Sequence, residues 1–97
     1  MKELRNRIDR IDCEIQKLFE ERMEVADEIG KYKAARGVPV FDAAREREKI
    51  AGLRAKAGDE ESADGIEELF TEIMAISRRH QEKILKETKM QNKEKNE

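Results

Sequence analysis

The stretch LFEERMEVADEIGKYK, residues 18–33, has the periodicity of an amphipathic helix, yet it places cations on its apolar side. Outward from this stretch, apolar residues recur at heptad spacing through residues 4–32. The positions of this heptad seam are Leu4, Ile8, Ile11, Ile15, Leu18, Arg22, Val25, Ile29 and Tyr32. The pattern predicts one long helix over residues 3–35, and a helix of that length in so small a chain has to lie against another long helix.

The segment RGVPVFD, residues 36–42, interrupts the helical pattern. Gly37 is a helix stop, Pro39 disfavours a helical conformation in the residue before it, and Asp42 is a candidate N-cap. A second, shorter helix is therefore expected through AAREREKIAGLRAKA, residues 43–57.

A third helix is expected after the acidic segment DEES, residues 59–62, with Ser62 as its candidate N-cap. Spacings of three and four give this helix one buried apolar face, made of Ile66, Leu69, Phe70, Ile73, Met74, Ile76, Ile84 and Leu85. The end of the chain is polar and expected to fray, so we place one domain at residues 1–90 and a tail at residues 91–97. The predicted fold class is all-α, with a long, a short and a long helix.

Charge is abundant but balanced. Of the 97 residues, 45% are charged, 37% hydrophobic and 4% aromatic, and 21 Lys and Arg against 23 Asp and Glu leave a net charge of −2. This balance gives no support to binding of nucleic acid or an anionic membrane through bulk charge, so an anion site would need a local concentration of cations. One copy could build only a thin core, which favours oligomerisation.

Cysteine content and hydropathy indicate the compartment. Cys13 is the single cysteine, so an internal disulfide is impossible and a reducing environment is the default. The opening MKELRNRIDR lacks the apolar core of a signal peptide, and no uncharged stretch has the length of a membrane span. We therefore expect a soluble, cytoplasmic protein with neither a membrane nor a nucleic-acid partner.

Arg22 and Lys33 are the two cations that interrupt the apolar side of the first predicted helix. Eleven residues separate them, which places both on one face with Cα atoms about 16 Å apart. They could hold a small dianion between them, or they could extend past a partner helix into solvent. Spacing alone leaves both interpretations open.

The third predicted helix carries polar residues on its apolar face. Ser77 and Gln81 are four residues apart, in line with Ile73 and Ile84. Buried polar groups need partners, which could be a ligand, the backbone or each other.

The start of the second predicted helix combines Asp42, Arg45 and Glu46 at spacings of three and four. These residues could be an N-cap and an exposed charged turn, or part of a site. His80 is interpreted as a packed or solvated residue, and Cys13 as inert. No catalytic triad, metal-ligand cluster or cofactor fingerprint appears, so we expect neither metal nor cofactor, and a site that binds an anion and shapes its electrostatics.

Four motifs together carry a resemblance to a known family. They are LR at residues 4–5, ERMEVADEIGKYK at residues 21–33, VPVFDAARERE at residues 38–48 and ISRRHQ at residues 76–81. With these motifs the sequence resembles the all-helical, type II chorismate mutases from residue 4 to about residue 85. No single motif is specific, but their combination is.

The resemblance implies roles for the cations and the amide. Arg5, Arg22 and Lys33 would hold the two carboxylates of chorismate. Lys33 and Gln81 would be the catalytic pair, donating hydrogen bonds to the ether oxygen.

The resemblance also implies roles for the remaining candidates. Glu46, with the backbone near Asp42, would take the ring hydroxyl, and Ser77 would touch a carboxylate. Arg45 fits the family pattern, either as a direct substrate contact or by ordering neighbouring carboxylates.

If Arg5 belongs to the same site, it has to come from a second chain. Arg5 precedes Arg22 by about 25 Å along a straight helix and Lys33 by about 42 Å, so it cannot reach the same small ligand from the same chain. A second copy with its long helix running antiparallel could supply it. The resemblance implies the same arrangement, an intertwined homodimer in which each site borrows one arginine.

The implied activity is that of an isomerase, chorismate mutase, which converts chorismate to prephenate in phenylalanine and tyrosine biosynthesis. This unimolecular Claisen rearrangement needs no covalent intermediate. An isochorismate pyruvate-lyase, with the same architecture and a similar cationic pocket, is the nearest alternative. A non-catalytic helical interaction protein is the alternative that composition alone favours.

Overall fold

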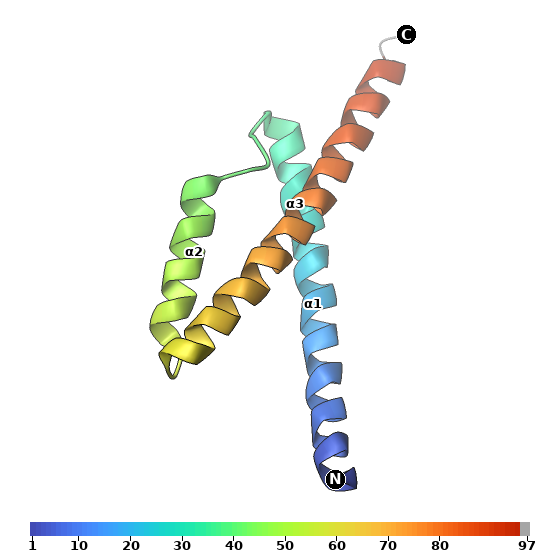
Figure 1. The fold of residues 1–97 in the computed structure, drawn as a ribbon. Coiled ribbons are helices and arrows are strands. Elements are labelled where there is room, and N and C mark those ends of the chain that lie inside the picture. The colour runs from blue at the N-terminus through green and yellow to red at the C-terminus, as the bar shows by residue number, and fades with distance from the viewer. Residues whose placement is uncertain (96–97) are drawn as a thin grey trace.

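The computed structural model describes residues 1–95 and contains three helices. They are α1 (Lys2–Arg36), α2 (Ala43–Lys56) and α3 (Glu60–Lys95), and no strand occurs among these residues. The prediction of an all-α chain with a long, a short and a long helix is confirmed. In Figure 1, α3 crosses the upper part of α1, while α2 lies to one side and meets the start of α3 in a sharp turn.

The helix ends predicted around residues 36–42 are confirmed. Gly37 ends α1 in the left-handed conformation, at φ 67° and ψ 24°, and its N–H donates to the Lys33 carbonyl. The Asp42 carboxylate accepts a hydrogen bond from the Arg45 N–H at 3.0 Å and caps α2. These two residues turn the chain from α1 into α2 beside the C-terminal end of α1.

The predicted cap of the third helix is wrong. Asp59, not Ser62, caps α3, because the Asp59 carboxylate accepts a hydrogen bond from the Ser62 N–H at 2.7 Å. The acidic residue lies one helical turn earlier and satisfies a free N–H of the first turn, so α3 begins at Glu60. This backbone hydrogen bond, together with one from the Ser62 side chain, lowers the pKa of Asp59 below its ordinary value of 3.8.

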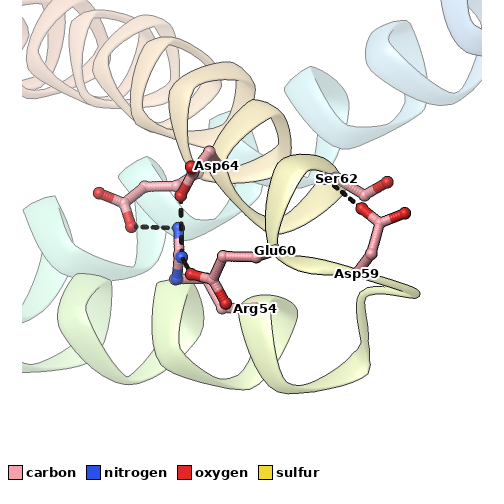
Figure 2. A network of polar contacts seen from close by, with 6 residues as sticks. Arg54, Asp59, Glu60, Ser62 and Asp64 are labelled. Atoms are coloured by element: carbon pink, nitrogen blue, oxygen red, sulfur yellow. Dashed lines mark hydrogen bonds and ion pairs between the residues drawn. The ribbon is translucent and has the colours of Figure 1, made fainter.

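Arg54 of α2 links that helix to the beginning of α3, as Figure 2 shows. The Arg54 guanidinium contacts Glu60 at 2.5 Å, Asp64 at 2.9 Å and Glu67 at 3.1 Å. The hydrogen bond to Asp64 is the main cause that raises the pKa of Arg54. All three carboxylates are exposed, so each ion pair by itself stabilises the α2–α3 turn only weakly. The network stabilises the turn because Arg54 has three partners at once.

The crossing of α1 and α3 depends on one glycine. Gly30 is buried, and a Cβ atom there would lie 3.1 Å from the Gln81 Cα and 3.3 Å from the Ile84 Cβ. A side chain at this position would require α3, whose backbone is the nearest neighbour, to move by a few tenths of an ångström. A second contact joins α1 and α3, because His80 Nδ1 lies 3.0 Å from a carboxylate oxygen of Asp27.

The single chain is thin, with principal extents of 62 × 31 × 14 Å. The buried apolar residues within the described chain are Met23, Ala26, Val40, Ala63 and Met74. So few buried residues make only a small core, as expected for a chain of this length.

The apolar residues of the α1 heptad seam are not buried against α3. The buried residues of α1 are Met23, Ala26 and Gly30, which lie on a different face of the helix. The apolar seam residues are between 42% and 65% exposed: Leu4, Ile8, Ile11, Ile15, Leu18, Val25, Ile29 and Tyr32. The expected second long helix against this seam is therefore missing from the described part of the chain.

The last helix is longer than expected. The helix α3 continues through Lys95, so residues 91–95 of the expected frayed tail are helical, and residues 96–97 lie outside the described residues. Leu69 on the expected buried face is 53% exposed. Within residues 1–95, no helix combines the length and the apolar character needed to cross a bilayer.

Candidate active site

One cavity lies between the upper part of α1, the start of α2 and the middle of α3. Its volume is about 340 Å³, the size of a small-molecule site. Its lining residues are Arg22, Ile29, Lys33, Val40, Asp42, Arg45, Glu46, Lys49, Met74, Ser77, Arg78 and Gln81. Seven of the eight residues predicted from the sequence therefore meet here, from three helices and one loop.

The cavity is strongly cationic in an acidic protein. Five lining side chains are Lys or Arg and two are Asp or Glu, whereas the whole chain has a net charge of −2. Converging cations around an enclosed space raise the local concentration of anions. The cavity therefore has the local concentration of cations that an anion site in this chain needs.

Lys33 is held by the loop that follows α1. Its ammonium donates a hydrogen bond to the Val40 carbonyl at 2.8 Å, in a partly buried setting. An ammonium has three donors, so two remain for a ligand. Of the two interpretations open from sequence, extension past a partner helix does not describe Lys33, since its ammonium lies at the cavity wall.

Ser77 and Gln81 are buried, at 8% and 7% exposure, as the sequence predicts. The Gln81 Nε2 donates to the Ser77 Oγ at 3.2 Å. The Gln81 Oε1 has no hydrogen-bond partner, alone among the fully buried side-chain nitrogens and oxygens of the described chain. A buried amide with an unpaired oxygen costs free energy, which is a common mark of a site that completes its hydrogen bonds with a ligand.

The residues at the start of α2 behave differently from one another. Asp42 caps the helix and Arg45 is exposed at the cavity rim. Glu46 is partly buried and paired with Arg78 of α3. The alternative of an exposed charged turn therefore fits Arg45 but does not fit Glu46.

Arg5 is the predicted site residue that the structure does not bring to the cavity. It is exposed near the N-terminal end of α1, and it is not among the residues that line the cavity. Since α1 is continuous from Lys2 to Arg36, Arg5 lies several turns away from Arg22.

Sequence reasoning missed two cations of the cavity, Lys49 and Arg78. Helical spacing contains a signal for both, because Lys49 follows Arg45 by four residues, and Arg78 precedes Gln81 by three. His80 lies outside the cavity lining, paired with Asp27, and Cys13 is exposed.

An all-helical chain with a cationic cavity between three helices defines a class of protein, helical proteins that bind a small anion. Comparison with known families narrows the class. Residues 4–82 match the model of the family described as chorismate mutase type II. The chain belongs to this family, and the resemblance seen in the sequence is confirmed.

Individual relatives agree with this assignment. The chain is similar to the T-protein of Haemophilus influenzae, with 40% identity over an 81-residue alignment that covers 79% of this chain but only 21% of that protein. It is also similar to the chorismate mutase of Methanocaldococcus jannaschii, with 33% identity over 94% of this chain and 93% of the relative. Among solved structures, chorismate mutase (form II) from Thermus thermophilus superposes with a TM-score of 0.79 at 34% identity, covering 84% of this chain and 92% of that one.

Proposed function

We propose that this protein is a chorismate mutase, an isomerase that rearranges chorismate to prephenate on the way to phenylalanine and tyrosine. The observation that carries the proposal is the cavity, in which seven predicted site residues and an excess of positive charge surround a space of about 340 Å³. The family assignment and the M. jannaschii relative, matched over nearly its whole length, support it.

The cations bind the two carboxylates of the substrate. Arg22 and Lys33 lie on the α1 side of the cavity, and Arg45 stands at its rim. A guanidinium forms two parallel hydrogen bonds with a carboxylate, while an ammonium acts as a point charge. Ser77, as a hydroxyl donor, adds a contact to a carboxylate, and the Asp42 backbone with Glu46 takes the ring hydroxyl.

Lys33 and Gln81 favour the transition state. The rearrangement separates charge as the carbon–oxygen bond breaks, so donors aimed at the ether oxygen stabilise the transition state more than the substrate. The Gln81 Nε2 donates one of its two N–H groups to the Ser77 Oγ. Its second N–H is therefore free for the ether oxygen, and the Ser77 hydroxyl proton stays free for the carboxylate.

Binding a compact conformer supplies the rest of the acceleration. The reaction is unimolecular and involves no proton transfer, so the protein needs no nucleophile or base. Holding the two reacting ends of chorismate together replaces an entropic cost that the free molecule bears in solution.

We infer that the protein acts as an intertwined homodimer, with Arg5 reaching the site of the partner copy. The chain is thin, with a short dimension of 14 Å, and the exposed apolar seam of α1 needs a covering surface. An antiparallel second copy would cover the seam, and it would bring its own Arg5 toward the cavity that this chain leaves without it. We assign residues 1–90 to the catalytic domain and residues 91–97 to a tail, and we place the protein in the cytoplasm, where Cys13 would stay reduced.

The test is turnover by the purified protein. Chorismate is incubated with the wild type and followed by proton NMR, with prephenate as the expected product and no release of pyruvate. Pyruvate released from isochorismate would indicate the lyase instead. Absence of any reaction from a folded, oligomeric protein would leave the interaction protein as the better description.

A further inference from the structure

Arg78 contacts both oxygens of the Glu46 carboxylate. One guanidinium nitrogen lies 2.5 Å from Oε1 and 2.6 Å from Oε2, and the two residues come from helices α3 and α2. Their side chains are 33% and 24% exposed, and both line the cavity. A charge-assisted contact in this setting restrains the carboxylate more than an ion pair on open surface does.

A second contact fixes the guanidinium itself. The Arg78 Cζ lies 5.0 Å from the centre of the Phe41 ring, within the range of a cation–π interaction. The loop after α1 therefore supplies one wall for Arg78, and α2 supplies its carboxylate. With two partners from two elements, Arg78 has little freedom to turn toward other groups.

Joining α2 to α3 does not by itself require this pair. At the other end of α2, Arg54 already binds three carboxylates of α3, and Figure 2 shows that network at the turn. The Arg78–Glu46 pair instead lies where the ligand would bind. Its position points to a role in the site.

We propose that Arg78 is a positioning residue that holds the Glu46 carboxylate in the orientation needed to accept the ring hydroxyl of the substrate. This inference rests on the proposed function. Without Arg78, a glutamate on a helix surface rotates among several rotamers, and few of them face the cavity. Because a carboxylate offers about four acceptor sites, the contact with Arg78 leaves acceptors free for the hydroxyl.

A double-mutant cycle on the full chain tests the proposal. Chorismate turnover is measured for the wild type, Arg78→Met, Glu46→Ala and the double variant. Met keeps the long apolar side chain but removes the charge and the donors. Arg79→Met is the matched control, since it is the next residue on α3, is exposed and does not line the cavity. Circular dichroism and thermal melting confirm that each variant folds.

The expected results follow from a role in which Arg78 affects turnover only by orienting Glu46. Arg78→Met lowers kcat/KM by about 10-fold to 100-fold, the usual loss when a group that orients a functional residue is removed. The same change made in Glu46→Ala lowers kcat/KM by less than about threefold, because nothing remains to be positioned. Arg78→Lys recovers part of the loss, since an ammonium can still contact the carboxylate, and Arg79→Met leaves kcat/KM unchanged.

If the loss of kcat/KM in the double variant equals the product of the two single losses, Arg78 acts on the ligand independently of Glu46. That result, or full activity of Arg78→Met, overturns the positioning role while the wild-type activity still stands. If the wild type itself does not convert chorismate, both the proposed function and this inference fall.

Discussion

At the scale of single residues, Lys33 performs two tasks. Its ammonium links α1 to the loop through the Val40 carbonyl, and its side chain lines the cavity with two donors unused by this contact. Placing a cation this close to the apolar side of a helix costs free energy unless a partner or a ligand interacts with it. The proposed use is the stabilisation of charge on the ether oxygen.

Lys33→Ala should nearly abolish turnover and leave the helical fold intact. Loss of one transition-state donor typically lowers kcat by about 100-fold to 1,000-fold. The measurement is steady-state kinetics with chorismate, accompanied by circular dichroism. Lys31→Ala is the control, because Lys31 is exposed on the same helix and pairs only with Glu28. Near-normal rates from folded Lys33→Ala would contradict the proposed role.

Gln81→Glu should make activity depend on pH. An amide does not titrate, so the proposed role predicts a broad profile for the wild type. The substituted acid can donate to the ether oxygen only when protonated, so the activity of the variant should rise as the pH falls. A profile of kcat/KM against pH checks this, and a flat profile for the variant would remove Gln81 from the ether oxygen.

At the scale of helices, two contacts set the frame that holds these residues. Gly30 permits the close crossing of α1 and α3 next to Gln81, and Asp59 starts α3 at the turn after α2. Both can be tested with matched substitutions.

Gly30→Ala should lower both stability and activity, because the strain at the helix crossing outweighs the gain in helix propensity. The new Cβ would lie 3.1 Å from a backbone atom of Gln81, so the helices have to separate there, at a typical cost of about 1–3 kcal/mol. Gly52→Ala and Gly65→Ala are the controls, because no atom lies within 4 Å of the added Cβ, and each should stabilise its helix by about 0.5–1 kcal/mol. Urea unfolding and turnover are measured, and unchanged activity of Gly30→Ala would refute the close-contact role.

Asp59 should make stability fall at acidic pH. Its pKa is lower in the folded protein than its ordinary value of 3.8, so the unfolded chain binds the proton more tightly. The stabilisation is complete above about pH 3.8 and is lost as the pH falls through the lower, folded value. Asp59→Asn keeps a cap that does not titrate, so the wild type should lose melting temperature relative to this variant only in the acidic range. An acid-independent difference at equal protein concentration would be inconsistent with the cap.

At the scale of the whole molecule, the single chain looks incomplete. Its shortest dimension is 14 Å, the apolar residues of its α1 seam are exposed, and Arg5 does not line its cavity. A second copy, with its α1 antiparallel to the first, would thicken the core, cover the seam and bring an Arg5 to the cavity.

Mixing two inactive variants tests the shared site. Arg5→Ala and Lys33→Ala are unfolded, combined in equal amounts and refolded. A hybrid dimer has one site with both residues intact, so about a quarter of the wild-type sites should be restored by random pairing. Turnover is compared with each variant refolded alone. No recovery, with hybrid dimers demonstrated by mass spectrometry, would exclude Arg5 in trans.

The sequence by itself determined the three helices, because heptad spacing, Gly37 and Asp42 act locally. Periodicity also singled out four residues that line the cavity, Arg22, Lys33, Ser77 and Gln81, because polar groups on apolar faces stand out. The resemblance to the family, and not periodicity, indicated Asp42, Arg45 and Glu46. Only the tertiary structure decided that Asp59 caps α3, that the apolar residues of the α1 seam stay exposed, and that Arg78 binds Glu46. The physical reason is that periodicity defines which side of a helix is apolar, but packing between distant segments chooses what each side meets.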